Sequence, residues 1–249
     1  MKIKMIVTDL DGTLLKDDKS VTEFTRNVLK QCRAKGIKTA LATARGHPEK
    51  LVPVELFDGR ITNNGAVIIA DNVVYRRNMS YQEARPLLMA CDKRGLKMTS
   101  QDIDMHYTNF DISAIWPHIK GFEIVDFSKH EIDSDKICME NGSPDDIEFM
   151  RQNLSDNMYL TVTRDNLAMV MHRDATKSKA VATLAKHWGI EQEEIAVFGD
   201  DMNDIDMLEY AGAGVAMGNA LDEVKAAAGY ICDTNENDGL AKWLEENAL

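Results

Sequence analysis

The sequence predicts an α/β protein with a doubly wound, Rossmann-like parallel sheet, interrupted by an inserted α+β module. Three observations predict this class. Short apolar runs alternate with helical patterns near both ends of the chain, polar residues follow the apolar runs, and the alternation is lost in the middle. We therefore expect a core domain formed by residues 1–79 and 174–249, with residues 80–173 as the inserted domain.

The first elements are expected to be strand, helix and strand. Ile3–Val7 is an apolar run of strand length. Ser20 and Glu23 have the spacing of a capping box, and apolar residues at helical spacing continue to Gly36. Ile37–Thr43 is the second apolar run. The next expected elements are a short helix opened by Pro48 and a hairpin of Ala66–Ala70 and Val73–Tyr75.

The inserted module mixes both periodicities. A helix is expected over Tyr81–Arg94, where Pro86 predicts a kink or a later start. A second helix should follow Ser143, an N-cap residue before a first-turn proline. The expected strands are Leu96–Ser100, Lys136–Glu140, Tyr159–Thr163 and Leu167–His172.

The α/β alternation resumes after Lys177, with right-handed crossovers between parallel strands. The expected elements are a helix over Lys179–His187, a strand over Ile195–Phe198, a helix from about Asp204, a strand near Val215, a helix from about Leu221 and a strand near Ile231.

Composition and charge exclude several classes. The chain has 249 residues, of which 44% are hydrophobic and 28% charged, as in ordinary globular proteins. Its formal net charge of -12 argues against nucleic acid or an anionic membrane as a partner. The charge does not exclude phosphate substrates, because a metal ion and a few local cations can reverse the field inside a pocket.

Cysteine usage and the chain start favour a reducing compartment. Four scattered cysteines form no CxxC pair, so a zinc or redox site is not expected. No apolar stretch approaches the roughly 20 residues of a membrane span, and the apolar run near the start is too short for a signal peptide. We expect a cytoplasmic protein, and nothing in the pattern indicates its oligomeric state.

The first apolar run ends in the string Asp-Leu-Asp-Gly-Thr-Leu-Leu. Residues i and i+2 of a strand share a face, so Asp9 and Asp11 can point into one small volume. Gly12 lets the chain turn away without a side chain. Carboxylates suit a hard cation such as Mg²⁺, which often shares its ligands with a substrate phosphate. An acidic turn at a strand end is the alternative for a DxD pair alone.

Further polar groups follow the other apolar runs. Thr43 ends the second run, Lys177 opens a helix, and the string Gly-Asp-Asp-Met-Asn-Asp, residues 199–204, follows the third. Ligands bind at the carboxyl ends of strands in open parallel sheets. The four segments therefore predict one site that contains acids, a hydroxyl group and a lysine.

The order of these motifs resembles the haloacid dehalogenase superfamily of phosphohydrolases, in its Cof-type sugar-phosphatase branch with a class IIB-like cap. The resemblance covers most of residues 1–80 and 173–249. Ala44 and Ser178 stand where the branch usually has glycine. The resemblance implies that the inserted module is a cap that shapes the leaving-group pocket.

The resemblance also implies roles for individual residues. Asp9 would be the nucleophile that forms an aspartyl-phosphate, and Asp11 the general acid and later base. One acid of such a close pair can stay protonated. Mg²⁺ would bridge the Asp9 carboxylate, the Asp11 backbone carbonyl and Asp200. Lys177 would face the phosphoryl oxygens, and the resemblance favours it over Lys179.

Several assignments compete. Asp201 and Asp204 compete with Asp200 as the metal ligand; the resemblance favours Asp200, with Asp204 orienting water or the lysine. Asp206 is expected to be a solvated helix residue. Thr43 is expected to be a catalytic residue whose hydroxyl and following N–H face a phosphate oxygen; without the other motifs it would be read as a strand end with no role. The expected substrate contacts are Asn203, which resembles a phosphate-binding asparagine, Arg45, which could equally be a surface residue, and Asn64, which could equally be a turn former.

The expected function is a Mg²⁺-dependent phosphatase of a small phosphorylated metabolite, with a sugar phosphate foremost. A phosphomutase of the phosphomannomutase type is the enzymatic alternative, and it would need a bisphosphate activator. A non-enzymatic phospho-receiver or binding protein is the alternative of another class. A receiver is about half this length and lacks the inserted module.

Overall fold

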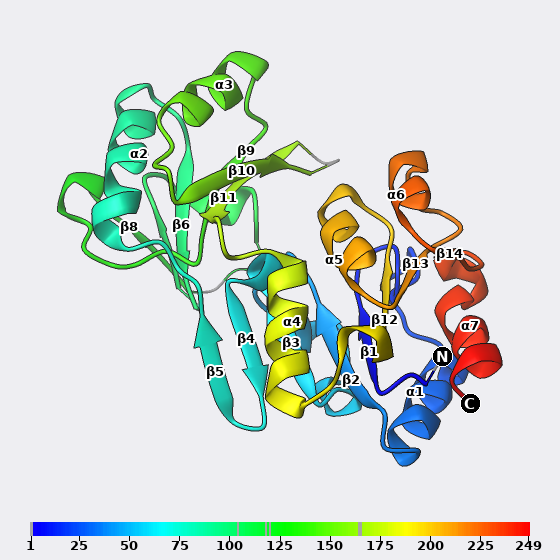
Figure 1. Cartoon of the computed structure of the whole chain (residues 1–249). Coiled ribbons are helices and arrows are strands. Elements are labelled where there is room, and N and C mark those ends of the chain that lie inside the picture. Colours follow the sequence, from blue (N-terminus) through cyan, green and yellow to red (C-terminus); the bar gives the residue numbers. More distant parts are fainter. Residues whose placement is uncertain (1, 104, 118, 120, 164–165) are drawn as a thin grey trace. The chain divides into compact units, whose positions relative to one another are not determined.

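The computed structural model describes residues 2–103, 105–117, 119, 121–163 and 166–249 (Figure 1). The chain forms two compact units: a core unit, Met1–Tyr75 with Thr176–Leu249, and an inserted unit, Arg76–Ala175. The inserted unit begins four residues before, and ends two residues after, the range 80–173 expected from the sequence. The expected fold class, an α/β core with an α+β insertion, is confirmed.

One eight-stranded sheet organises the core unit, in the order β14-β13-β12-β1-β2-β3-β4-β5. Strands β14 to β3 are parallel, and β4 runs antiparallel to β3. In chain order the strands are β1 Met5–Thr8, β2 Lys38–Ala42, β3 Gly59–Thr62, β4 Val67–Ala70, β5 Val73–Arg76, β12 Ile195–Gly199, β13 Ala213–Ala216 and β14 Tyr230–Ile231.

The central strand is β1, which pairs with β2 on one side and β12 on the other. Its four residues are fully buried, as expected for a strand covered on both faces. Helix α1 connects β1 to β2, and α5 connects β12 to β13, which lies in the opposite direction along the sheet. Because both crossovers are right-handed, the two helices lie on opposite faces of the sheet. The helices are α1 Glu23–Ala34, α4 Lys177–Trp188, α5 Ile205–Tyr210, α6 Asp222–Ala227 and α7 Gly239–Asn247, with short 3₁₀ turns η1 Pro48–Lys50, η2 Val54–Leu56, η3 Asn63–Gly65, η6 Gln192–Glu194, η7 Met202–Asp204 and η8 Asn235–Asn237.

The expected capping box at Ser20 is wrong. The N-cap of α1 is Thr22, whose hydroxyl oxygen accepts from the backbone N–H of Thr25. Both threonine hydroxyls also donate to Asp238, which precedes α7. This distant carboxylate, together with burial of Val21, fixes the start of the helix two residues later than the local pattern indicates.

A six-stranded sheet organises the inserted unit, in the order β10-β11-β9-β6-β7-β8. All neighbours are antiparallel except β7 and β8. The elements are α2 Tyr81–Lys93, β6 Met98–Asp102, β7 Met105–Thr108, η4 Ile112–Ala114, β8 Phe122–Ile124, η5 Phe127–Lys129, β9 Lys136–Glu140, α3 Pro144–Gln152, β10 Met158–Val162 and β11 Leu167–His172. Strands β7 and β8 were not expected, because three or four residues show too little periodicity.

Helix α2 begins where the sequence predicts, despite its internal Pro86. Ser80 and Glu83 form a capping box, and Asp133 accepts from the N–H of Tyr81. These contacts satisfy N–H groups at the helix start, so the later start that the proline suggested is wrong.

In the part of the chain that the structure describes, no helix has the length and apolar character required to cross a membrane.

Candidate active site

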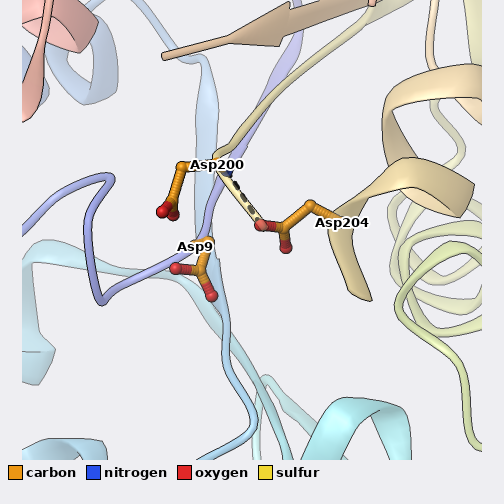
Figure 2. Close-up of side chains that lie close together, drawn as sticks. All are labelled: Asp9, Asp200 and Asp204. Carbon is orange, nitrogen blue, oxygen red and sulfur yellow. Dashed lines mark hydrogen bonds between the residues drawn. The ribbon is translucent and has the colours of Figure 1, made fainter. Parts of the chain in front are cut away.

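Three buried carboxylates meet at the carboxyl edge of the core sheet (Figure 2). Asp9 directly follows β1 and Asp200 directly follows β12, the parallel neighbour of β1. Asp204 reaches the same place from η7. Carboxylate oxygens of the three residues lie within 4.8 Å of one another. The pairing of β1 with β12 therefore brings together residues almost 200 positions apart.

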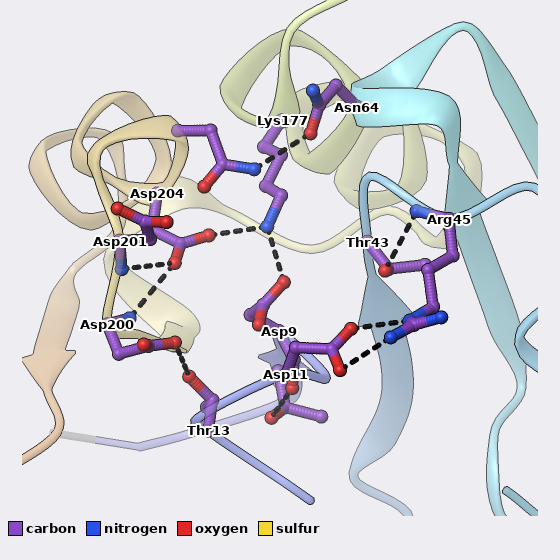
Figure 3. A network of polar contacts seen from close by, with 12 residues as sticks. Asp9, Asp11, Thr13, Thr43, Arg45, Asn64, Lys177, Asp200, Asp201 and Asp204 are labelled. Atoms are coloured by element: carbon purple, nitrogen blue, oxygen red, sulfur yellow. Dashed lines mark hydrogen bonds and ion pairs between the residues drawn. The ribbon is translucent and has the colours of Figure 1, made fainter. Parts of the chain in front are cut away.

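Lys177, the first residue of α4, is the cation of this cluster (Figure 3). Its side chain is 1% exposed, and its Nζ donates to Asp9 Oδ1 at 2.6 Å and to Asp204 Oδ1. Burial alone would lower the pKa of Lys177, but the charges of Asp204 and Asp9 outweigh burial and raise it. Lys179, the sequence competitor, is exposed.

The balance of charge in the cluster suits a divalent cation. Burial raises the pKa of Asp9 well above its usual value; Lys177 opposes this shift, while Asp204 and Asp200 add to it. Among the described residues, three carboxylates thus face one ammonium group in a buried space. Because the donors are all carboxylate oxygens, the set fits a hard cation such as Mg²⁺ rather than a thiolate-preferring metal.

Asp204 also supports the loop that carries Asp200. Its Oδ2 accepts from the backbone N–H groups of Asp200 and Asp201, at 2.9 and 3.0 Å. The side chain of Asp201 accepts from the N–H of Met202 and so caps its own turn. Of the three acids that compete for the metal role, Asp200 and Asp204 are therefore the two that lie in the cluster.

The glycine and threonine after the acid pair hold Asp200, a contact that sequence reasoning missed. Thr13 Oγ1 donates to Asp200 Oδ1 at 2.8 Å. Gly12 has φ +81°, and a Cβ at this position would lie 2.4 Å from Asp200 Oδ2. The Gly-Thr step of the first motif was the available signal, but its partner is 187 residues away.

We expect Gly12→Ala to reduce turnover on the order of 10²-fold, because the new Cβ displaces Asp200 and a misplacement of about 1 Å has an effect of this size. The measurement is kcat for phosphate release. The matched control is Gly36→Ala: Gly36 has the same φ of +81°, but no described atom lies within 4 Å of the position that its new Cβ would take. An equal loss of activity in the two variants would assign the effect to backbone strain, and wild-type activity of Gly12→Ala would contradict the role of the contact with Asp200.

Asp11 turns away from the carboxylate cluster. Its oxygens accept from Arg45 Nε and Nη2, at 2.6 and 2.9 Å, and from Lys19 Nζ at 2.9 Å. Burial alone would raise the pKa of Asp11, but the bonds from Arg45 and Lys19 outweigh it and lower the pKa. The paired, ionised state differs from the protonated state expected of a general acid. Arg45 thus lies in the site, whereas the role of Lys19 was not foreseen.

Thr43 and Asn64 lie beside the cluster (Figure 3), and Asn203 reaches it through a contact with Asn64. Thr43 Oγ1 accepts from the N–H of Arg45 at 3.1 Å, and its carbonyl accepts from the N–H of Asn64. Asn203 Nδ2 donates to Asn64 Oδ1 at 2.9 Å. The following Gly65 has φ +105°, and a Cβ there would lie 2.4 Å from the carbonyl oxygen of Thr176, so the Asn64 turn abuts the start of α4.

Two further asparagines brace the first motif from the C-terminal part of the chain. Asn219 Nδ2 donates to the Gly12 carbonyl at 2.7 Å, and Asn219 Oδ1 accepts from the N–H of Asn235. Asn235 is buried, and its Nδ2 donates to the Leu15 carbonyl at 3.0 Å. An isolated asparagine carries no sequence signal, so this brace was not predicted.

The expectation that Asp206 is a solvated helix residue is wrong. Its carboxylate accepts from both the N–H and the hydroxyl of Ser178, next to Lys177. The two residues are 28 positions apart, and no pattern in the sequence indicates that they are in contact.

Acids and a lysine at the carboxyl ends of the parallel core strands, together with relatives named as phosphatases, identify the chain as a hydrolase of phosphoric monoesters. The family of haloacid dehalogenase-like hydrolases matches residues 6–244, and the chain belongs to this family. Its relatives support a Cof-type member, as the motifs indicated.

Three relatives illustrate this membership. The chain is 31% identical over 258 residues to the Bacillus subtilis 5-amino-6-(5-phospho-D-ribitylamino)uracil phosphatase YcsE, covering 99% of this chain and 96% of that protein. It is 27% identical to the structure of the HAD subclass IIB sugar phosphatase BT4131, with a TM-score of 0.85 and 98% of each chain covered. It is 27% identical to the phosphatase structure BT1666 from Bacteroides thetaiotaomicron, with a TM-score of 0.85, covering 98% of this chain and 95% of that chain.

Proposed function

We propose that this protein is a Mg²⁺-dependent phosphatase that hydrolyses a small phosphorylated metabolite, a sugar phosphate foremost, through an aspartyl-phosphate. The observation that carries the proposal is the buried Asp9 carboxylate, held by Lys177 at the end of the central strand. Lys177 binds Oδ1, which leaves Oδ2 of Asp9 for attack on phosphorus.

In the first step, an Asp9 oxygen forms a bond to phosphorus and the bond to the leaving oxygen breaks. Asp11 gives a proton to that oxygen, and later takes a proton from the water that cleaves the aspartyl-phosphate. For this role Asp11 must first lose its bonds with Arg45 and Lys19, which keep it ionised in this structure, and take up a proton from solvent. The two released cations then face the phosphate oxygens, together with Lys177 and the amides of Asn64 and Asn203.

The groups that would hold Mg²⁺ are the carboxylates of Asp9 and Asp200 and the backbone carbonyl of Asp11, with Asp204 beside them. The support is the all-carboxylate cluster and its excess of negative charge. When bound, the ion supplies positive charge against the phosphoryl oxygens. Asp204 keeps Lys177 and the Asp200 loop in place.

The inserted unit is proposed to select the leaving group. It contains a cavity of about 230 Å³ with both apolar and polar lining groups. The lining includes the apolar residues Phe110, Ile115 and Trp116 and the polar residues Lys97, Thr99 and Glu140. Aromatic rings beside hydroxyl, amine and carboxylate groups suit a small polyhydroxylated or heterocyclic compound.

Replacing Tyr81–His172 by a short Gly/Ser linker should reduce hydrolysis of the true substrate more than hydrolysis of p-nitrophenyl phosphate, because the generic ester has few leaving-group contacts to lose. The measurement is kcat/KM for both compounds with intact and shortened protein. Equal losses would mean that the inserted unit supports the core, and its role in specificity would be discarded.

The function is tested by a screen of phosphorylated metabolites with Mg²⁺ that measures released phosphate. Sugar phosphates and 5-amino-6-(5-phospho-D-ribitylamino)uracil, the substrate in the name of one relative, belong in the first panel. Isomerisation that needs a bisphosphate and releases no phosphate would indicate a mutase instead. Binding without turnover of any compound would indicate a receiver or binding protein.

We also propose that the protein acts in the cytoplasm, without a nucleic-acid or membrane partner. The net charge of -12 and four free cysteines support this placement.

A further inference from the structure

One contact outside the proposed chemistry joins the helix of the lysine to the loop of the acids. Ser178 follows Lys177 in the first turn of α4. Its backbone N–H and its hydroxyl both donate to Asp206 Oδ2, at 3.0 and 2.6 Å. The other oxygen of Asp206 is buried and, among the described residues, has no hydrogen-bond partner. A carboxylate at this end of a helix also complements the helix dipole.

The same short segment therefore holds the start of α4 at two places. Asp204 binds the ammonium group of Lys177, and Asp206, two residues later, binds the backbone and hydroxyl of Ser178. Asp204 binds the N–H of Asp200 as well. A movement of α4 relative to α5 would thus change the distance between Lys177 and the acid cluster.

We propose that Asp206 and Ser178 are a positioning pair that sets the Lys177 ammonium against Asp9 during phosphoryl transfer. This inference rests on the proposed function. A lysine side chain has four flexible carbons, so its reach depends on where the helix begins. Glycine in place of Ser178 would keep the N–H bond to Asp206 and lose the hydroxyl bond, so the serine supplies a second connection that glycine cannot provide.

The alternative is that Asp206 only stabilises the end of a helix, and kinetics separate the two roles. We expect Asp206→Ala to lower kcat for p-nitrophenyl phosphate by 10- to 100-fold, with little change in KM, at a temperature where the variant is fully folded. Asp206→Asn should recover most of kcat, because its amide oxygen can accept both bonds. Ser178→Gly should lower kcat three- to tenfold.

The double variant provides the coupling test. If Asp206 acts through Ser178, Asp206→Ala with Ser178→Gly should be no slower than Asp206→Ala alone. The matched control is Glu23→Ala, which removes an acid from the first turn of α1. This helix has twelve residues, as α4 does, and carries no proposed site residue. The control variant should keep wild-type kcat. A kcat for Asp206→Ala within twofold of wild type, or single effects that multiply in the double variant, would overturn the proposal.

A crystal structure of Asp206→Ala tests the positioning role without any measurement of activity. We expect Lys177 Nζ to move away from Asp9 Oδ1, from which it lies 2.6 Å in the wild type. An unmoved Nζ overturns the positioning role even if the wild type hydrolyses no tested ester. An inactive wild type with a displaced Nζ in the variant would count against the proposed function alone.

Discussion

Asp9→Asn is expected to abolish turnover, by about 10³-fold or more, while leaving the fold intact. An amide oxygen is a poor nucleophile, but it has the shape of the carboxylate and can still accept the bond from Lys177. Because burial raises the pKa of Asp9, removing its charge should not lower the free energy of unfolding. The measurements are phosphate release with Mg²⁺ and the melting temperature.

The control for this substitution is Asp201→Asn, which changes an acid that follows Asp200 but lies outside the carboxylate cluster, and keeps a side chain able to cap the turn. It should retain activity within a few-fold. If Asp9→Asn keeps even a tenth of wild-type activity, covalent catalysis by Asp9 is wrong. Beryllium fluoride, which mimics a phosphoryl group, should lie against the Asp9 carboxylate in a crystal structure of the wild type.

Removal of divalent metal by EDTA is the second large effect, and we expect it to abolish activity until Mg²⁺ is restored. Ca²⁺ should bind and inhibit, because its larger and more flexible coordination would misplace the nucleophile. Mg²⁺ should also raise the melting temperature of metal-free protein, by an amount that grows with its concentration, since it binds only the folded cluster.

Asp200→Asn should weaken this thermal shift, which is a readout that does not depend on turnover. Asp201→Asn should preserve it, because Asp201 lies outside the cluster. Stoichiometric zinc in active protein, unaffected by EDTA, would contradict the prediction of a Mg²⁺ site.

The convergence of Asp9, Lys177 and Asp200 could be predicted because each follows or opens a strongly patterned element. The end of a strand of apolar residues can be recognised in the sequence, and parallel strands have their carboxyl ends at the same edge of the sheet. The sequence thus indicated which segments meet. It also indicated Asn203 as a neighbour of the site, which the contact with Asn64 places there.

The contacts of Asp11 and Asp206 could not be predicted, because they depend on three-dimensional packing. Lys19 lies in a loop without periodicity, so nothing in the pattern directs its ammonium group to Asp11. Asp206 lies in the short helix α5 between Ile205 and Met207, and only the packing of α4 against α5 brings it to Ser178. The prediction of where α1 starts was wrong for the same reason, since Thr22 binds Asp238, which is 216 positions away in the sequence.

The central place of β1 has a consequence for synthesis on the ribosome. Met5 pairs with Ile195, so one edge of β1 has no native partner until β12, about 190 residues later in the chain, has emerged. At about 5–20 residues per second, this delay is roughly 10–40 s. The inserted unit is continuous in sequence and can form its own sheet within that time. The nascent core meanwhile exposes an unpaired apolar strand, a surface that chaperones bind and that promotes aggregation.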